Sequence, residues 1–160
     1  MLLDLTAAPA ALERPVSPSV VRITDPREVD AIVALENEVW QDDHQVLGEF
    51  LKRELVEQPD RLSVYVSREG GQVVSAAWIY FHPGTRFAGL FGGSTLPQFR
   101  NQGHYSRLLA ARAQEARARG FTLLSTDASP MSRPILEKHG FQDLATTTPC
   151  MWKAESLPQS

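Results

Sequence analysis

The chain has a single cysteine, Cys150, among its 160 residues. One cysteine cannot form an internal disulfide, so this is not a small secreted domain held together by cross-links. No group of cysteines and histidines has the spacing of a zinc site. We therefore expect a protein of the reducing cytoplasm that binds no metal.

Long hydrophobic runs are also missing. No apolar stretch approaches about 18 residues, the length at which a helix begins to span a bilayer. Residues 1–8 include Asp4 and no basic side chain, which is unlike a secretory signal peptide. We expect no association with a membrane.

An excess of positive charge is lacking as well. The 16 Lys+Arg and 19 Asp+Glu give a formal net charge of -3, which argues against a nucleic-acid-binding protein. Residues 1–99 hold 8 basic and 14 acidic residues, whereas residues 100–160 hold 8 basic and 5 acidic ones. The basic part is suited to a polyanionic ligand. The simpler alternative is a helix that carries Arg112, Arg117 and Arg119 on its solvent-exposed face.

The composition that remains is that of an ordinary globular domain. Hydrophobic residues make up 42% of the chain and charged residues 22%, and the length fits one domain. Residues 7–19 are rich in alanine, proline and serine, which is typical of a linker. We expect a flexible tail over residues 1–18, one domain over residues 19–154 and a second tail over residues 155–160.

Hydrophobic periodicity predicts alternating strands and helices. Strands are expected over residues 19–24, 62–67, 72–82, 87–96, 123–127, 141–144 and 147–153, and helices over residues 26–40, 46–56, 103–119 and 130–139. Hairpins in the first part and strand–helix–strand units in the second predict an α/β fold, with a mixed sheet between helices.

Candidate chemistry concentrates where the strand 87–96 runs through a short loop into the helix 103–119. The first amides of a helix have no partner within it, and with the helix dipole they attract anions. Gly103 has no Cβ, so a phosphate can approach the backbone closely there. Arg100 adds a fixed positive charge. The loop lacks the glycine and lysine spacing of nucleotide and dinucleotide sites.

Two motifs give the sequence a resemblance to the GNAT superfamily of acetyl-CoA-dependent N-acetyltransferases. The family signature Arg/Gln-x-x-Gly-x-Gly/Ala is matched at its first four positions by the segment Arg100-Asn101-Gln102-Gly103-His104-Tyr105, and Tyr105 departs from the last. The family's Tyr-Glu-Lys-x-Gly-Phe is similar to Leu136-Glu137-Lys138-His139-Gly140-Phe141, except at the tyrosine. The resemblance covers residues 19–153.

The resemblance implies the GNAT fold, with a mostly antiparallel sheet flanked by helices, and acetyl-CoA as co-substrate. It places pantetheine between the fourth and fifth strands of the family and the pyrophosphate on the loop before the helix. The implied cofactor-binding residues are Thr95, Leu96, Arg100, Asn101, Gln102, Gly103, His104, Tyr105 and Ser132.

The same resemblance implies transfer of the acetyl group to an amine by direct attack in a ternary complex. The usual proton-donating tyrosine is replaced by Leu136, so Tyr105 is the candidate acid, and His82 and Glu38 are candidate bases. The acceptor pocket is expected to include Trp40, Asp43, His44 and Tyr80.

The acceptor is an unidentified amine, and the acidic first part of the chain favours a cationic one. One alternative is a GNAT-like module that binds acyl-CoA without turnover, since Leu136 cannot donate a proton. A homodimer stays an open alternative to a monomer.

Overall fold

A computed structural model describes residues 1–148 and 150. Its strands are β1 (Leu2–Asp4), β2 (Val20–Ile23), β3 (Leu62–Glu69), β4 (Gln72–Phe81), β5 (Phe87–Thr95) and β6 (Leu123–Ser125). Its α-helices are α1 (Val29–Trp40), α2 (Gln45–Glu57), α3 (His104–Ala118) and α4 (Arg133–Lys138), and short 3-10 turns are η1 (Leu5–Ala7), η2 (Ala10–Leu12), η3 (Pro26–Glu28) and η4 (Pro97–Phe99).

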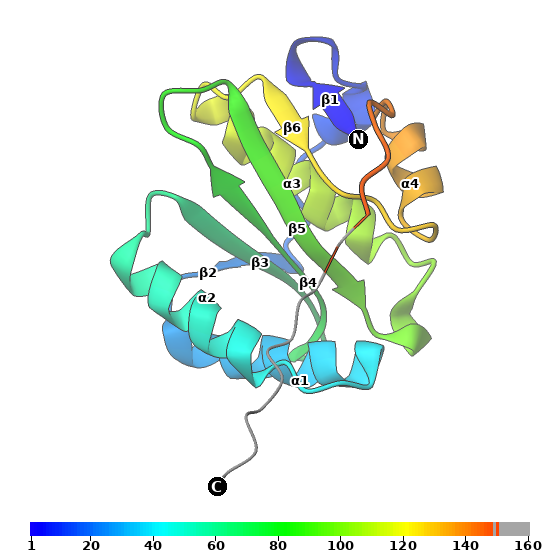
Figure 1. Cartoon of the computed structure of the whole chain (residues 1–160). Helices are drawn as coiled ribbons and strands as arrows, with labels where there is room; N and C mark the ends of the chain where they lie inside the picture. The colour runs from blue at the N-terminus through cyan, green and yellow to red at the C-terminus, as the bar shows by residue number, and fades with distance from the viewer. Residues whose placement is uncertain (149, 151–160) are drawn as a thin grey trace, which may run out of the picture.

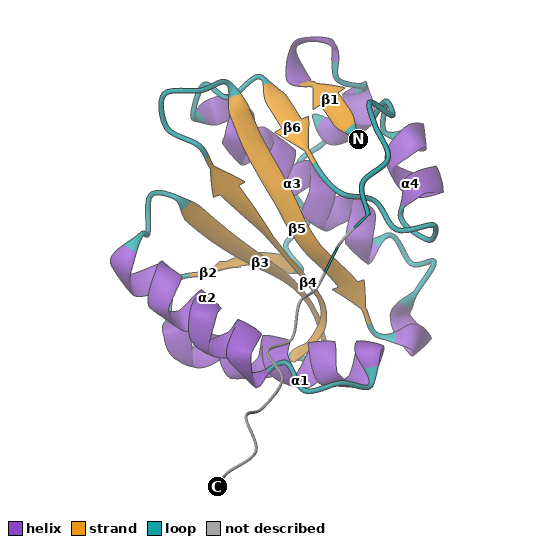
Figure 2. Cartoon of the chain, viewed as in Figure 1, coloured by secondary structure: helices purple, strands orange, loops and turns teal. Residues whose placement is uncertain are grey.

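The strands form one sheet in the order β1-β6-β5-β4-β3-β2. Strands β5 and β6 are parallel, and the other neighbouring pairs are antiparallel. Figure 1 shows α1 and α2 together at one side of the sheet and α3 running behind β5, and Figure 2 shows the three layers by type. The mixed α/β fold with a mostly antiparallel sheet is thereby confirmed.

Two hydrophobic clusters lie on the two faces of the sheet, because central strands bury both faces. On β4, Ile79 and Phe81 pack in the cluster that includes α3 and α4. Val74 and Trp78 face the other way, into the cluster that includes α1 and α2. The near-continuous apolar run of β4 in the sequence follows from this double burial.

Polar contacts fix α3 on β3. Glu115 accepts hydrogen bonds from the hydroxyls of Ser63 and Tyr65, both at 2.9 Å. The ring Nδ1 of His104 lies 2.9 Å from the hydroxyl of Ser67. These contacts, about three turns of helix apart, set the position of the α3 N-terminus relative to the sheet.

Strands β5 and β6 separate part-way along β5. The register pairs residues 87–89 with residues 123–125, after which β6 ends while β5 continues to Thr95. On its other side, β5 pairs with β4 through a register shift: Ala76 is opposite Ser94, and Ala77 is opposite Gly92. Gly93 is therefore the extra residue of a β-bulge, and its backbone groups are left out of the ladder.

The expected flexible tail at residues 1–18 is wrong for its first part. Strand β1 pairs antiparallel with β6, and Leu3, Leu5 and Leu12 are 2–3% exposed within the core. The amide of Gln114 on α3 also donates to the carbonyl of Leu12 (2.8 Å). The alanine- and proline-rich composition predicted a linker, although three leucines of this segment complete the hydrophobic core.

The two last predicted strands are not found in the described residues. Gln142 makes a single bridge with Leu2 where a strand over residues 141–144 was expected. Residues 147, 148 and 150 have no strand conformation, and residues 149 and 151–160 lie outside the described part. Within the described residues, a single bridge between Leu2 and Gln142 extends the β1 edge of the sheet.

Candidate active site

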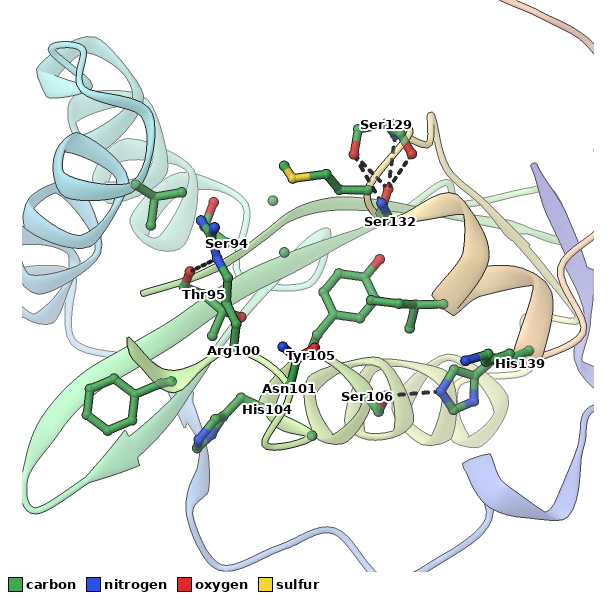
Figure 3. A pocket seen from close by; sticks show the side chains of 18 of the residues that line it. Ser94, Thr95, Arg100, Asn101, His104, Tyr105, Ser106, Ser129, Ser132 and His139 are labelled. Carbon is green, nitrogen blue, oxygen red and sulfur yellow. Dashed lines mark hydrogen bonds between the residues drawn. The ribbon is translucent and has the colours of Figure 1, made fainter. Parts of the chain in front are cut away.

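A cavity of about 690 Å³ opens where β5 and β6 separate. Its walls come from the second half of β5, the loop and first turn of α3, the segment before and within α4, and the end of α1. Figure 3 shows these elements converging on one space, with Tyr105 near its centre. The cavity therefore joins the α3 N-terminus to the β5 bulge.

The α3 N-terminus forms one end of the cavity. Gly103 has φ +82°, and the first backbone hydrogen bond of the helix runs from the Arg107 amide to the Gly103 carbonyl (3.0 Å). The amides of residues 103–106 precede this bond, so they are available to an anion. A Cβ on Gly103 would meet only the guanidinium of Arg107, at 4.0 Å, which leaves the approach to these amides open.

Charged side chains of both signs line the cavity. Arg100 and Lys138 contribute positive charge, and Asp127 contributes negative charge. The guanidinium Nε of Arg100 donates to the carbonyl of Thr95 (3.2 Å), which holds the side chain against the end of β5. Arg100 and the α3 N-terminus favour a phosphate-bearing ligand at that end of the cavity.

Tyr105 reaches the middle of the cavity from the first turn of α3 (Figure 3). Its ring lies over the β5 bulge, and a Cβ on Gly93 would stand 2.7 Å from Cε2 of the ring. Burial raises the pKa of the Tyr105 phenol. The hydroxyl therefore stays protonated at neutral pH and is available as a donor.

A buried carboxyl lies behind the opposite wall. Glu36 on α1 is 3% exposed, and its Oε2 accepts hydrogen bonds from the Ser94 hydroxyl (2.7 Å) and the Trp40 indole (2.9 Å). Ser94 and Trp40 both line the cavity, whereas Glu36 lies behind them. Burial raises the pKa of the Glu36 carboxyl, and the two hydrogen bonds and nearby His44 lower it in part.

Besides His104, a second histidine lines the cavity: His139, which directly follows the last residue of α4. The ring Nε2 of His139 lies 3.1 Å from the hydroxyl of Ser106, so this pair joins the end of α4 to the first turn of α3. Burial lowers the pKa of His139. A neutral ring there adds no positive charge to the cavity.

A family model described as the Acetyltransferase (GNAT) family matches residues 29–141, which is more than half of the chain. The chain belongs to the GNAT acetyltransferase family. The match spans both motifs of the sequence, so the expected family membership is confirmed. No curated protein matches this sequence.

Solved GNAT-like structures share the fold at low sequence identity. A predicted acetyltransferase with acetyl-CoA from Clostridium acetobutylicum is 20% identical with a TM-score of 0.69, over 82% of this chain and 94% of that chain. The aminoglycoside N-acetyltransferase AAC(6')-Iy, in complex with a CoA-linked bisubstrate analogue, is 18% identical with a TM-score of 0.69, over 84% and 97%. An acetyltransferase of Trypanosoma brucei is 16% identical with a TM-score of 0.69, over 83% and 98%.

Eight of the fifteen residues that the sequence predicts for the site line the cavity. They are Trp40, Thr95, Arg100, Asn101, Gly103, His104, Tyr105 and Ser132. Ser132 lies beside Ser129, whose amide donates to its hydroxyl (3.0 Å). His104 contributes only its backbone, because its imidazole is buried against β3 and bonded to Ser67.

Two residues that were predicted to bind the cofactor do not line the cavity. Leu96 is 1% exposed, its amide donates to the Val74 carbonyl (3.0 Å) and its carbonyl accepts from the Phe99 amide (2.9 Å). Its backbone is thus engaged within the fold. Gln102 lies outside the cavity lining, and its side chain donates to the Gln98 carbonyl (3.1 Å).

Both candidate bases from the sequence lie outside the cavity. Glu38 is exposed on the solvent face of α1. His82 follows the far end of β4, six residues beyond Ala76, which pairs with Ser94. At ~3.3 Å per residue it is about 20 Å from the bulge. The structure corrects both predictions and offers Glu36 instead.

The remaining acceptor-pocket residues also lie outside the cavity lining. Asp43 is exposed, and its carboxylate accepts from the Gln45 amide (2.9 Å) at the start of α2. The ring Nδ1 of His44 lies 3.2 Å from the side-chain oxygen of Asn37. Tyr80 packs edge-on against Phe91, with ring centroids 5.7 Å apart. These three predictions are therefore not supported by their placement.

Sequence reasoning missed Glu36 and Ser94. The signal for Glu36 was present, because Glu36 and Trp40 are four residues apart and so share one face of α1. Nothing in the sequence shows that Ser94 is opposite that face. The described residues hold no group of three or more His, Cys, Asp or Glu side chains that is arranged for a metal. None of the described helices is long and apolar enough to cross a membrane.

Proposed function

We propose that this GNAT protein transfers an acetyl group from acetyl-CoA to an amine by direct attack in a ternary complex. The observation that carries the proposal is the continuous cavity between the α3 N-terminus and the β5 bulge. One end has the free amides and cations that a pyrophosphate needs. The other end has an unpaired backbone segment and a phenol, which suit an acyl thioester.

The residues present fit acetyl-CoA. The amides of residues 103–106 and the Arg100 guanidinium would hold the pyrophosphate, with the Gly103 backbone left open by the missing Cβ. The edge of β5 beyond residue 89, where the pairing with β6 has ended, would hydrogen-bond the pantetheine amides, as an added strand does. When acetyl-CoA is bound, it supplies an activated acetyl thioester.

The chain's own groups then orient the transfer. The backbone of Gly93, left out of the ladder by the bulge, would polarise the acyl carbonyl. As the new N–C bond forms and the C–S bond breaks, the protonated Tyr105 hydroxyl is placed to donate to the departing sulfur. Tyr105 thus takes the role left vacant by Leu136, which is 1% exposed.

The acceptor is proposed to be a cationic amine. The wall opposite α3 is formed by α1 and includes the indole of Trp40, with Glu36 buried behind it. Negative charge at that wall favours an ammonium group. Two of the structural neighbours are aminoglycoside N-acetyltransferases, whose acceptors carry several amines.

The test is release of the CoA thiol from acetyl-CoA in the presence of amines. The panel contains an aminoglycoside, a linear diamine and a free amino acid, and acetyl-CoA binding is measured in parallel. We expect thiol release that depends on the amine and is fastest with the two polycationic acceptors. Tight acetyl-CoA binding without release on any amine would favour the alternative, an acyl-CoA-binding module. Faster turnover of the free amino acid would contradict the cationic preference.

A further inference from the structure

We propose that Glu36 removes the proton of the acceptor amine through the hydroxyl of Ser94. This inference rests on the proposed function and assigns the proton acceptor that the reaction requires. The amine binds on the α1 side of the β5 bulge, with its nitrogen next to the Ser94 hydroxyl. Trp40 holds the pair in place from the rim of the cavity.

The hydrogen bonds give Ser94 a defined direction. Its hydroxyl lies 2.7 Å from Oε2 of Glu36, which is a carboxyl that accepts when ionised, so Ser94 donates its proton there. The indole Nε1 of Trp40 lies 2.9 Å from the same carboxylate oxygen and 3.0 Å from the Ser94 oxygen, and donates to both. A hydroxyl oxygen accepts two bonds, so one lone pair of Ser94 is left for a donor from the cavity.

If the buried carboxyl of Glu36 had only a structural role, it would lower the stability of the folded protein. Its Oε1 is buried and has no hydrogen-bond partner among the described residues. A buried carboxylate without an adjacent cation destabilises a fold in general. A neutral glutamine in the same place would still accept from Ser94 and Trp40. A titratable carboxyl at this position is therefore better explained by proton transfer than by packing.

The position of the pair suits attack on the acyl carbon. Ser94 follows the bulge residue Gly93 directly and faces α1, whereas the ring of Tyr105 lies against Gly93 from α3. The proton acceptor and the proton donor thus stand on opposite sides of the bulge. A nucleophile that enters from the Ser94 side would leave the sulfur on the side of Tyr105.

The proton balance is complete without an added reagent. The ammonium gives one proton to the Ser94 oxygen as the Ser94 proton passes to Oε2 of Glu36. The neutral amine then forms the N–C bond, the C–S bond breaks with a proton from Tyr105 to sulfur, and the nitrogen of the new amide loses its second proton to solvent. Proton exchange of Glu36 and Tyr105 with solvent restores the starting state.

The pH profile distinguishes this role from a structural one. The group that must be ionised is Glu36, whose pKa burial raises above its usual range, and the titratable neighbour that lowers this pKa in part is His44, directly before α2. We therefore expect kcat to fall as the pH falls through this raised pKa. This fall of kcat at low pH, the acid limb of the pH profile, should be absent from a variant that cannot titrate at position 36.

The experiment compares E36Q, S94A and E38Q in the full chain, with an alkylamine as acceptor. E36Q keeps an acceptor oxygen for Ser94 and Trp40, whereas E38Q neutralises an exposed carboxylate two residues away. We expect kcat to fall about 100-fold in E36Q and S94A, as for the loss of a positioned general base. Acetyl-CoA affinity should stay within about twofold, and E38Q should behave as the wild type.

A second acceptor tests the chemistry itself. Hydroxylamine is unprotonated at neutral pH, so its loss of rate in E36Q should be at least tenfold smaller than that of the alkylamine. Equal losses for both acceptors, or an E36Q enzyme with wild-type kcat and an intact acid limb, would overturn the inference. If E36Q does not fold, S94A carries the same comparison. A wild-type protein that is inactive on every amine would overturn the proposed function as well.

Discussion

Replacing Gly93 with alanine places a methyl group between β5 and the ring of Tyr105. The backbone of Gly93 has φ +96°, which an L-residue adopts only at a cost of about 1–3 kcal/mol. The added Cβ would also stand 2.7 Å from Cε2 of Tyr105, which is closer than real Cβ contacts allow. Because the neighbouring atom is part of a rigid ring, the ring must move.

The backbone strain and the displacement of the Tyr105 ring can be distinguished, because the strain lowers Tm and the displacement lowers kcat. In a domain of this size the backbone cost lowers Tm by roughly 2–4 °C per kcal/mol, so about 2–12 °C in all. A misplacement of about 1 Å in a catalytic group costs about 100-fold in rate, and we expect kcat for acetyl transfer to fall 10- to 100-fold. Gly71→Ala is the matched control, because Gly71 has φ +85° in the β3–β4 turn and its Cβ would meet nothing within 4 Å.

The assay measures Tm by thermal unfolding and kcat by release of the CoA thiol, for both variants. We expect similar losses of Tm and a loss of kcat in G93A alone. Equal Tm values with full activity in G93A would refute the placement of Tyr105 as proton donor. An equal loss of activity in G71A would show that the rate follows stability rather than the geometry of the cavity.

Three further substitutions test the fold and the cofactor site. Gly103→Leu should raise the Kd for acetyl-CoA at least tenfold, as measured by calorimetry, with a loss of Tm similar to that of G71A, because both positions have positive φ and open space around the Cβ. An unchanged Kd would remove the α3 N-terminus from the site. Arg112→Met should destabilise the protein by about 1–3 kcal/mol in denaturant unfolding, because the buried guanidinium donates to the carbonyls of Trp78 and Phe91. Unchanged stability would show that these hydrogen bonds do not stabilise the fold. Leu3→Ala should cost about 2–5 kcal/mol, whereas a tail outside the fold would show no change.

Periodicity predicted most of the fold because each main helix and strand has one dominant pattern. The strand at residues 72–82 and the helix at residues 103–119 were found within one or two residues of their ends. Strand β1 has only three residues, too few for a pattern, and the proline-rich segment after it indicated a linker. Its burial depends on the edge of β6, which a linear sequence does not show.

The loop that lines the cavity could be predicted from the sequence, whereas the buried carboxyl behind the opposite wall could not. The loop needs a glycine at a helix start, which is a local feature, and Gly103 is at that position. A proton acceptor needs burial and neighbours from distant segments. Glu36 meets Ser94 across 58 residues of sequence, so Glu38 on the same helix was equally plausible from the sequence. Arg112 was assigned to the solvent face for the same reason, and it is 2% exposed.

A crystal structure with acetyl-CoA bound is the most direct test of the central claim. We expect the pyrophosphate to lie on the amides of residues 103–106, pantetheine to lie along β5 beyond residue 89, and the acetyl carbonyl to lie beside Gly93 and Ser94. The sulfur should then lie within hydrogen-bond reach of the Tyr105 hydroxyl. Acetyl-CoA bound elsewhere, or with its thioester away from the bulge, would contradict the account.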